Sequence, residues 1–295
     1  MRAKKLEVFI ENYIIKAAGI SVLVIMALIL LFMLKEGLPF ITQYSFTDFI
    51  AGKKWYPLSD IYGVLPLIYG TLLVTLISAL IAIPLSVATA IFIAEIAPMR
   101  FKGFLKVCLE ILASIPSVVF GFLGIIFAGP VIQSLFGLDS GMNAFTAGLL
   151  LAFMSIPTIA SVTEESLNAV PRNLREASLA LGATYLQTIF KVTLPAAFPG
   201  IFAGTMLGIG RAIGETMTVM MVAGGAAQIS LNIFKPVRTM TGTIAAEMGE
   251  VIYGDVHYSS LFMIGLLLFL ITLGINSLSG IVVAKIRSSH GGGNV

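Results

Sequence analysis

Residues 63–94 read GVLPLIYGTLLVTLISALIAIPLSVATAIFIA and contain no Asp, Glu, Lys or Arg. A helix needs roughly 20 apolar residues to cross the hydrocarbon core of a bilayer, so this stretch predicts a transmembrane helix. Four more stretches lack these charged residues, namely 17–34, 111–138, 140–163 and 258–284. A sixth, 192–226, contains only two charges, Arg211 and Glu215. We therefore expect an all-α polytopic membrane protein with about six transmembrane helices.

The composition excludes an ordinary soluble protein. Hydrophobic residues make up 58% and charged residues 11% of the chain, and the mean hydropathy is +1.00, whereas about a quarter of residues are charged in soluble domains. The single cysteine, Cys108, excludes a disulfide framework and a multi-cysteine metal site. No basic run resembles a nucleic-acid-binding patch, and we expect neither catalytic nor metal-ligating residues.

The distribution of Lys and Arg predicts the orientation in the membrane. Twelve of the 18 fall on the side of the N-terminus, five fall on the other side, and Arg211 lies within a span. Because cytoplasmic loops carry the excess of positive charge, both termini should be cytoplasmic. The outer set is Lys35, Lys53, Lys54, Lys235 and Arg238, and the inner set includes Arg2, Lys4, Lys5 and Lys16.

We expect a single transmembrane domain, 1–295. We expect an N-terminal helix at about 14–36, an outer loop at 37–62, a core at about 63–285 that includes a cytoplasmic loop at 164–195, and a short cytoplasmic tail at 286–295. The first helix is long and lacks an evident cleavage site, so we interpret it as a retained span. Trp55 in the outer loop suggests an interfacial helix or aromatic anchor, or a docking surface for an external partner.

Pro84, Pro116 and Pro157 are among the prolines that fall inside predicted spans. Each removes a backbone donor and tends to kink its helix, and helix breaks at membrane depth often line a pathway. Ser114 and Ser117 flank Pro116, where their hydroxyls could face a polar ligand. We place both serines in a candidate substrate pathway.

Residues 170–195 read VPRNLREASLALGATYLQTIFKVTLP and are too polar to cross the membrane. Pro171 suits a first helical turn, and Leu174, Ala177 and Leu181 form an apolar stripe. Gly182 should separate this helix from a second short one that ends at Pro195. The predicted shape is helix, glycine turn, helix on the cytoplasmic face.

The spacing in this loop resembles the EAA loop of ABC importer permeases. That pattern has Glu-Ala-Ala, three residues, Gly, nine residues and Ile-x-Leu-Pro. The chain has Glu176-Ala177-Ser178, then Gly182, then Val192-Thr193-Leu194-Pro195, with Ser for Ala and Val for Ile as departures. The resemblance implies a type I ABC importer-like permease fold and ATPase coupling through the loop. The residues that it implicates are Glu176, Ala177, Gly182, Leu194 and Pro195.

The two charges of the predicted fifth span define a second candidate site. On a helix, Arg211 and Glu215 would lie one turn apart on one face, and intramembrane charges are costly and commonly functional. Arg211 could meet an anion while Glu215 competes for it; alternatively, the two form a structural pair. Glycines at Gly200, Gly204 and Gly208 should let another helix approach this span closely, placing it in the protein interior.

Residues 210–217, GRAIGETM, resemble the signature of phosphate-importer permeases of the PstC type. Leu65-Pro66, Gly70-Thr71-Leu72, Ala97-Pro98 and residues 115–119 also resemble that family. The resemblance implies a permease subunit for phosphate import in a bacterial or archaeal plasma membrane. The candidate substrate pathway comprises Arg211, Glu215, Ser114, Ser117 and Thr218.

The resemblance also implies partners. These are a PstA-like second permease, two ATP-binding subunits and an external phosphate-binding protein. The chain has no G-x-x-x-x-G-K-[ST] motif, so ATP should be bound by partner subunits and no cofactor by this chain.

Three alternatives remain at this point. The substrate could be another oxyanion, such as sulfate, molybdate or phosphonate. The chain could be a single-chain ion-coupled secondary transporter, against which the EAA-like loop argues. It could also be a membrane enzyme using Glu110, Glu164, Glu165 or Glu215, although no nucleophile and base accompany these carboxylates.

Overall fold

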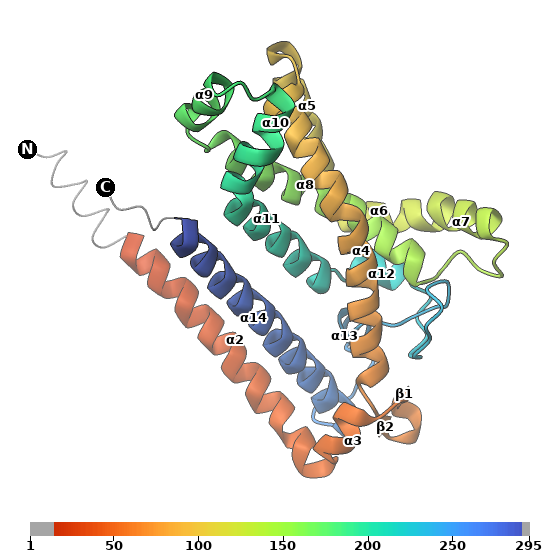
Figure 1. Ribbon diagram of the computed structural model, residues 1–295. Coiled ribbons are helices and arrows are strands. Elements are labelled where there is room, and N and C mark those ends of the chain that lie inside the picture. Colours follow the sequence, from red (N-terminus) through yellow and green to blue (C-terminus); the bar gives the residue numbers. More distant parts are fainter. Residues whose placement is uncertain (1–14, 291–295) are drawn as a thin grey trace, which may run out of the picture.

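Figure 1 shows a computed structural model of the chain, in which residues 15–290 are described. The predicted inner charges Arg2, Lys4 and Lys5 and the glycines 291–293 lie outside the described residues. The described chain contains six helices long and apolar enough to cross a membrane, which confirms the predicted number. They are Lys16–Gln43, Leu65–Ile96, Ser117–Phe136, Ala144–Asn168, Tyr185–Gly214 and Val256–Lys285.

Several spans are built from more than one helical segment. The uninterrupted ones are α2 (Lys16–Gln43), α8 (Ala144–Asn168) and α14 (Val256–His290). A π-helical turn, η3 (Phe92–Ile96), extends α4 (Leu65–Ile91). The third span comprises α6 (Ser117–Leu123), the π turn η4 (Gly124–Ala128) and α7 (Gly129–Phe136). The fifth comprises α10 (Tyr185–Thr188), the π turn η5 (Ile189–Thr193) and α11 (Leu194–Gly214).

Helix α8 is the central helix of the bundle and packs against both α4 and α11. On α11, Gly200, Gly204 and Gly208 each face a side chain of α8, and a Cβ atom at any of them would crowd that side chain. The predicted close approach at these glycines is therefore confirmed. The deepest burial, however, belongs to α8 and not to the fifth span.

Helices α2 and α14 lie side by side along one flank of the bundle (Figure 1). Phe32 and Phe262 meet edge-on between them, with ring centroids 5.6 Å apart. Most of the surface of α2 is apolar and exposed, including Ile20 and Leu23. Such a surface fits a helix solvated by lipid.

A small cap closes the end of the bundle opposite α9 and α10 (Figure 1). It contains α3 (Phe46–Ala51), the antiparallel hairpin β1 (Trp55–Tyr56) and β2 (Ile61–Tyr62), the turn η2 (Pro57–Ser59) and α13 (Met240–Glu247). Trp55 is only 6% exposed. The expectation of an interfacial anchor at Trp55 is wrong, because its ring is buried on the hairpin and its Nε1 donates to Glu247 at 3.1 Å.

Two stretches predicted as continuous spans are broken. The stretch 111–138 divides between α5 (Met99–Ser114) and α6, because Ile115 takes the extended conformation that a following proline favours. Pro84 and Pro157, by contrast, stay inside α4 and α8. The stretch 192–226 divides between α11 and α12 (Met217–Val222), because Glu215 is extended, with φ −68° and ψ 129°.

Candidate translocation and coupling sites

The two helix breaks meet in the structure. Thr218, in the first turn of α12, is fully buried and donates its hydroxyl to the carbonyl oxygen of Ser117 at 2.8 Å. Ser117 begins α6, directly after the break at Pro116. Met154 of the central helix α8 places its Sδ 3.2 Å from the same hydroxyl. Hydropathy alone gave two uninterrupted helices, whereas the chain brings two interrupted ones into contact.

Glu215 is held at the second break by its backbone and its carboxylate. Its carbonyl oxygen accepts a hydrogen bond from Thr241 Oγ1 of α13 at 2.9 Å. Its Oε1 accepts one from the backbone N–H of Thr218 at 3.4 Å. Glu215 thereby caps the start of α12, as a carboxylate beside free backbone donors is expected to do.

Arg211 lies in the last turn of α11, where a cation is stabilised by the helix dipole. Its Nη1 donates to Thr158 Oγ1 of α8 at 3.0 Å, and the residue is exposed. No ion pair joins Arg211 and Glu215, both of which the structure describes. The expected pairing on one helix face is wrong, because α11 ends at Gly214 and Glu215 leaves the helical path.

Ser114 has a different environment from the other predicted pathway residues. It is exposed at the end of α5, and its hydroxyl donates to the carbonyl oxygen of Ile111 in its own helix at 2.7 Å. The structure therefore brings Ser117, Thr218 and Glu215 together, while Arg211 lies one turn before Glu215 and Ser114 just before the other break.

The predicted coupling loop is a helix, a glycine turn and a second helix. The first helix, α9 (Arg172–Ala180), follows Pro171, and Gly182 has a φ of 84°, a conformation in which glycine is the favoured residue. Thr184 and Gln187 form a reciprocal capping box at the start of α10. Ser178 and Thr188 then join the two helices through their hydroxyls at 3.0 Å.

The second helix of the loop does not end at Pro195. It continues through the π turn η5 into α11, where Pro195 occupies the first turn. Pro195 has no backbone N–H to donate to the preceding turn, and the adjoining π turn is a local departure from α-helical hydrogen bonding at the same point. Consequently, Leu194 and Pro195 connect the loop to the fifth span, whereas Glu176 and Ala177 lie exposed on α9.

The loop also presents an apolar groove of about 460 Å³ between α9 and α10. Leu181 at its edge is 90% exposed. An exposed apolar groove with polar residues among its lining is typical of a surface that another protein covers.

The comparisons with known proteins agree with this architecture. Residues 86–288 match the family described as "Binding-protein-dependent transport system inner membrane component". The chain belongs to this family of transport permeases. It is 40% identical to the "Probable ABC transporter permease protein YqgH" of Bacillus subtilis, over 76% of this chain and 74% of that one. It is 33% identical to the phosphate transport system permease protein PstC of Mesorhizobium japonicum, over 94% and 90%, and 35% identical to PstC of Pasteurella multocida, over 83% and 82%.

Solved structures support the same permease fold. A bacterial ABC transporter for import of the acidic polysaccharide alginate matches with a TM-score of 0.65 at 17% identity, over 96% of this permease and 99% of that chain. The inward-facing MetNI methionine ABC transporter matches with a TM-score of 0.61 at 20% identity, over 79% and 99%. The expected type I ABC importer permease fold is confirmed, and the chain is a transporter subunit and not an enzyme.

An ion pair that the sequence did not reveal ties the coupling loop of this permease to its second span. Glu95 lies in η3 at the end of α4, and its side chain is only 3% exposed. Its Oε1 lies 3.0 Å from Arg175 Nη2 on α9, and its Oε2 accepts a hydrogen bond from the Tyr185 hydroxyl at 3.2 Å. A single acidic residue at the end of the apolar run 63–94 was the available signal.

A second unexpected cluster surrounds Glu247 of the permease at the opposite end. Its carboxylate lies 2.8 Å from Arg238 Nη1 and 2.8 Å from His257 Nε2, and it also accepts the Trp55 N–H. Tyr62 packs against Trp55 at 5.8 Å between ring centroids. Burial and the nearby Asp60 carboxylate raise the pKa of Tyr62 to about 12, so its phenol stays protonated. No spacing in the sequence relates these residues, which come from separate segments.

Proposed function

We propose that this chain is the membrane-spanning permease subunit of an ATP-driven phosphate importer. The observation that carries the proposal is its 33–35% identity, over most of its length, to permeases named PstC. An exposed arginine at a helix break adds chemical support, because a guanidinium binds tetrahedral oxyanions through several donors.

The substrate pathway in this proposal runs past the two helix breaks. Arg211 binds the anion, and Glu215 keeps the empty site close to neutral and competes for the guanidinium, so that binding stays weak enough for release. Thr218 and Ser117 hold the breaks together, and Ser114 offers a hydroxyl beside them. Arg211 and Glu215 do not form the predicted pair on one helix face, because Glu215 lies beyond the end of α11. Arg211 is therefore available to an anion.

The coupling pathway runs through the loop at 164–195. Glu176, Ala177 and Gly182 dock into a nucleotide-binding subunit, and Leu194 and Pro195 pass its movement into α11. Support comes from the exposed face of α9 and from the continuity of α10 with α11. A short helix with one fixed bend can be gripped by a partner and moved as a unit.

The proposed assembly contains a PstA-like permease, two ATP-binding subunits and an external phosphate-binding protein. ATP is bound by the partner subunits. The complex resides in a bacterial or archaeal plasma membrane, and the charge bias supports a cytoplasmic position for both termini of this chain.

The test is transport by the reconstituted complex. Proteoliposomes that contain the two permeases and the ATP-binding subunits should accumulate phosphate only when ATP and the binding protein are supplied, and phosphate should be preferred to sulfate, molybdate and phosphonate. If the complex preferred another oxyanion, phosphate would be the wrong substrate, but the ATP-driven mechanism would stand. Uptake by this chain alone, driven by an ion gradient, would show a secondary transporter instead.

A further inference from the structure

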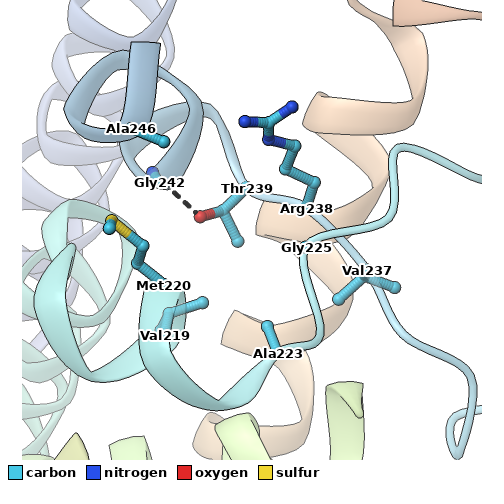
Figure 2. Close-up of a pocket in the computed structure, with 9 residues that line it drawn as sticks. All are labelled: Val219, Met220, Ala223, Gly225, Val237, Arg238, Thr239, Gly242 and Ala246. Atoms are coloured by element: carbon cyan, nitrogen blue, oxygen red, sulfur yellow. Dashed lines mark hydrogen bonds between the residues drawn. The ribbon is translucent and has the colours of Figure 1, made fainter. Parts of the chain in front are cut away.

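A small cavity lies between α12, the segment 223–239 and α13 (Figure 2). Its volume is about 170 Å³. Its lining is apolar except for Arg238 and Thr239, which come from the segment leading into α13, and Figure 2 shows the Arg238 guanidinium pointing away from Val219 and Met220 of α12. In such apolar surroundings a charge attracts an anion more strongly than it would in water.

The backbone of Arg238 is fixed by the second span. Gly70 of α4 touches it so closely that a Cβ atom at Gly70 would clash with the Arg238 carbonyl oxygen. Thr71 accepts a hydrogen bond from the backbone N–H of Met240 at 3.0 Å. The Gly70-Thr71 pair, distinctive in the sequence, therefore fixes the backbone from which the Arg238 side chain projects, and a fixed backbone lowers the entropic loss on binding a ligand.

The guanidinium of Arg238 retains unused hydrogen-bonding capacity. Its side chain is 24% exposed, and its one ion pair among the described residues joins Nη1 to Glu247. A guanidinium has five N–H donors, so several stay available to a ligand. Glu247 also contacts Trp55 and His257, so its carboxylate keeps partners when Arg238 turns toward an anion.

The cavity lies next to the two helix breaks. Val219 and Met220 line it and follow Thr218, the residue bonded to Ser117. From α13, Thr241 bonds to the Glu215 carbonyl oxygen. One turn of α12 thus separates the cavity from the proposed pathway, on the side away from the coupling loop.

We propose that Arg238 is a second anion-binding residue, which receives a phosphate-like oxyanion at the outer side before it reaches Arg211. This inference rests on the proposed function for the direction of transport. Glu247 is the ion-pair partner of the Arg238 guanidinium when the cavity is empty, and the incoming anion replaces it.

Trp55 supplies a reporter, because it is the chain's only tryptophan and donates its N–H to Glu247. The assembled complex is labelled with 5-fluorotryptophan in this subunit, and the ¹⁹F signal of Trp55 is assigned with Trp55→Phe. Phosphate is titrated at constant ionic strength against chloride. We expect a saturable shift of the Trp55 signal that survives in Arg211→Gln, is absent in Arg238→Gln and is retained at higher phosphate in Arg238→Lys.

Glu247→Gln provides a change in the opposite direction. The amide oxygen of the introduced glutamine can still accept a hydrogen bond from Trp55, but it no longer competes with phosphate for the Arg238 guanidinium. Half-saturation of the Trp55 shift should therefore occur at a phosphate concentration about three- to tenfold lower. No shift with any oxyanion, or a shift that persists in Arg238→Gln, would overturn the proposal. If sulfate or molybdate shifted the Trp55 signal and phosphate did not, Arg238 would still be an anion-binding residue, but phosphate would not be the substrate.

Discussion

Arg175 on α9 and Glu95 at the end of α4 form an ion pair of 3.0 Å, with the Glu95 side chain almost completely buried. The pair joins the loop proposed to dock on the ATPase subunits to the second span. Buried pairs transmit displacement because separating them leaves a desolvated charge without a partner. In the proposed mechanism, a movement of the loop therefore has two routes into the membrane, through α11 and through α4.

Replacing Glu95 by Gln should uncouple the transporter. Removing one partner of a largely buried ion pair lowers the free energy of unfolding by about 2–3 kcal/mol, a figure reduced here because Arg175 is partly exposed. We expect phosphate uptake to fall about tenfold while ATP hydrolysis persists, measured in proteoliposomes. Glu110→Gln, at an exposed carboxylate on α5, is the matched control. A double exchange, Glu95→Arg with Arg175→Glu, should recover part of the uptake, and uptake unaffected by Glu95→Gln would remove the pair from coupling.

Thr218→Val should weaken the contact between the two helix breaks. Valine keeps the volume but leaves the Ser117 carbonyl oxygen without its buried donor, which costs about 1–3 kcal/mol. A lower melting temperature of the purified complex and slower uptake are expected. Thr42→Val is the control, since Thr42 is exposed and bonds only within its own turn. Equal melting temperatures for the two variants would contradict the assigned role.

Gly182→Ala tests the bend of the coupling loop. The site has open space around it, so the cost comes from the φ of 84° alone, at about 1 kcal/mol. We expect weaker binding of the ATP-binding subunits, measured by titrating them onto the permease in nanodiscs. Gly103→Ala lies in helix α5 with equally open surroundings and should leave this affinity unchanged. If both variants bind alike, the bend is not needed for docking.

Glu176→Ala should separate substrate capture from transport. Glu176 is exposed on α9, so the fold should tolerate the change. Uptake should fall, whereas the affinity of the external binding protein for phosphate should stay constant in equilibrium titrations. Full uptake by this variant would remove Glu176 from the coupling surface.

Much of this architecture could be predicted from the sequence because the signals were local. The apolar runs predicted six spans, and Gly182 predicted the bend of the coupling loop. Glycines four residues apart predicted the close approach of another helix, which the structure identifies as the contact of α11 with α8. Hydropathy does not report where a helix stops inside an apolar stretch. It therefore missed the break at Glu215, and with it the fact that Arg211 and Glu215 do not share one helix. The Glu247 cluster also escaped, because Trp55, Arg238 and His257 meet only once the chain is folded.

Arg211→Gln tests the proposed anion site most directly. Glutamine keeps a polar side chain but loses the positive charge, and because it is shorter than arginine it also gives up the contact of Arg211 Nη1 with Thr158 Oγ1. We expect a complex that assembles and melts normally but transports phosphate at least about tenfold more slowly. Arg211→Lys should recover only part of the rate, because an ammonium cannot form the bidentate contact of a guanidinium. Thr158→Val, which removes the anchor but leaves the charge, should have the smaller effect on uptake. A complex that fails to assemble with Gln but not with Lys would assign the Arg211 charge to the structure of the bundle and not to the substrate.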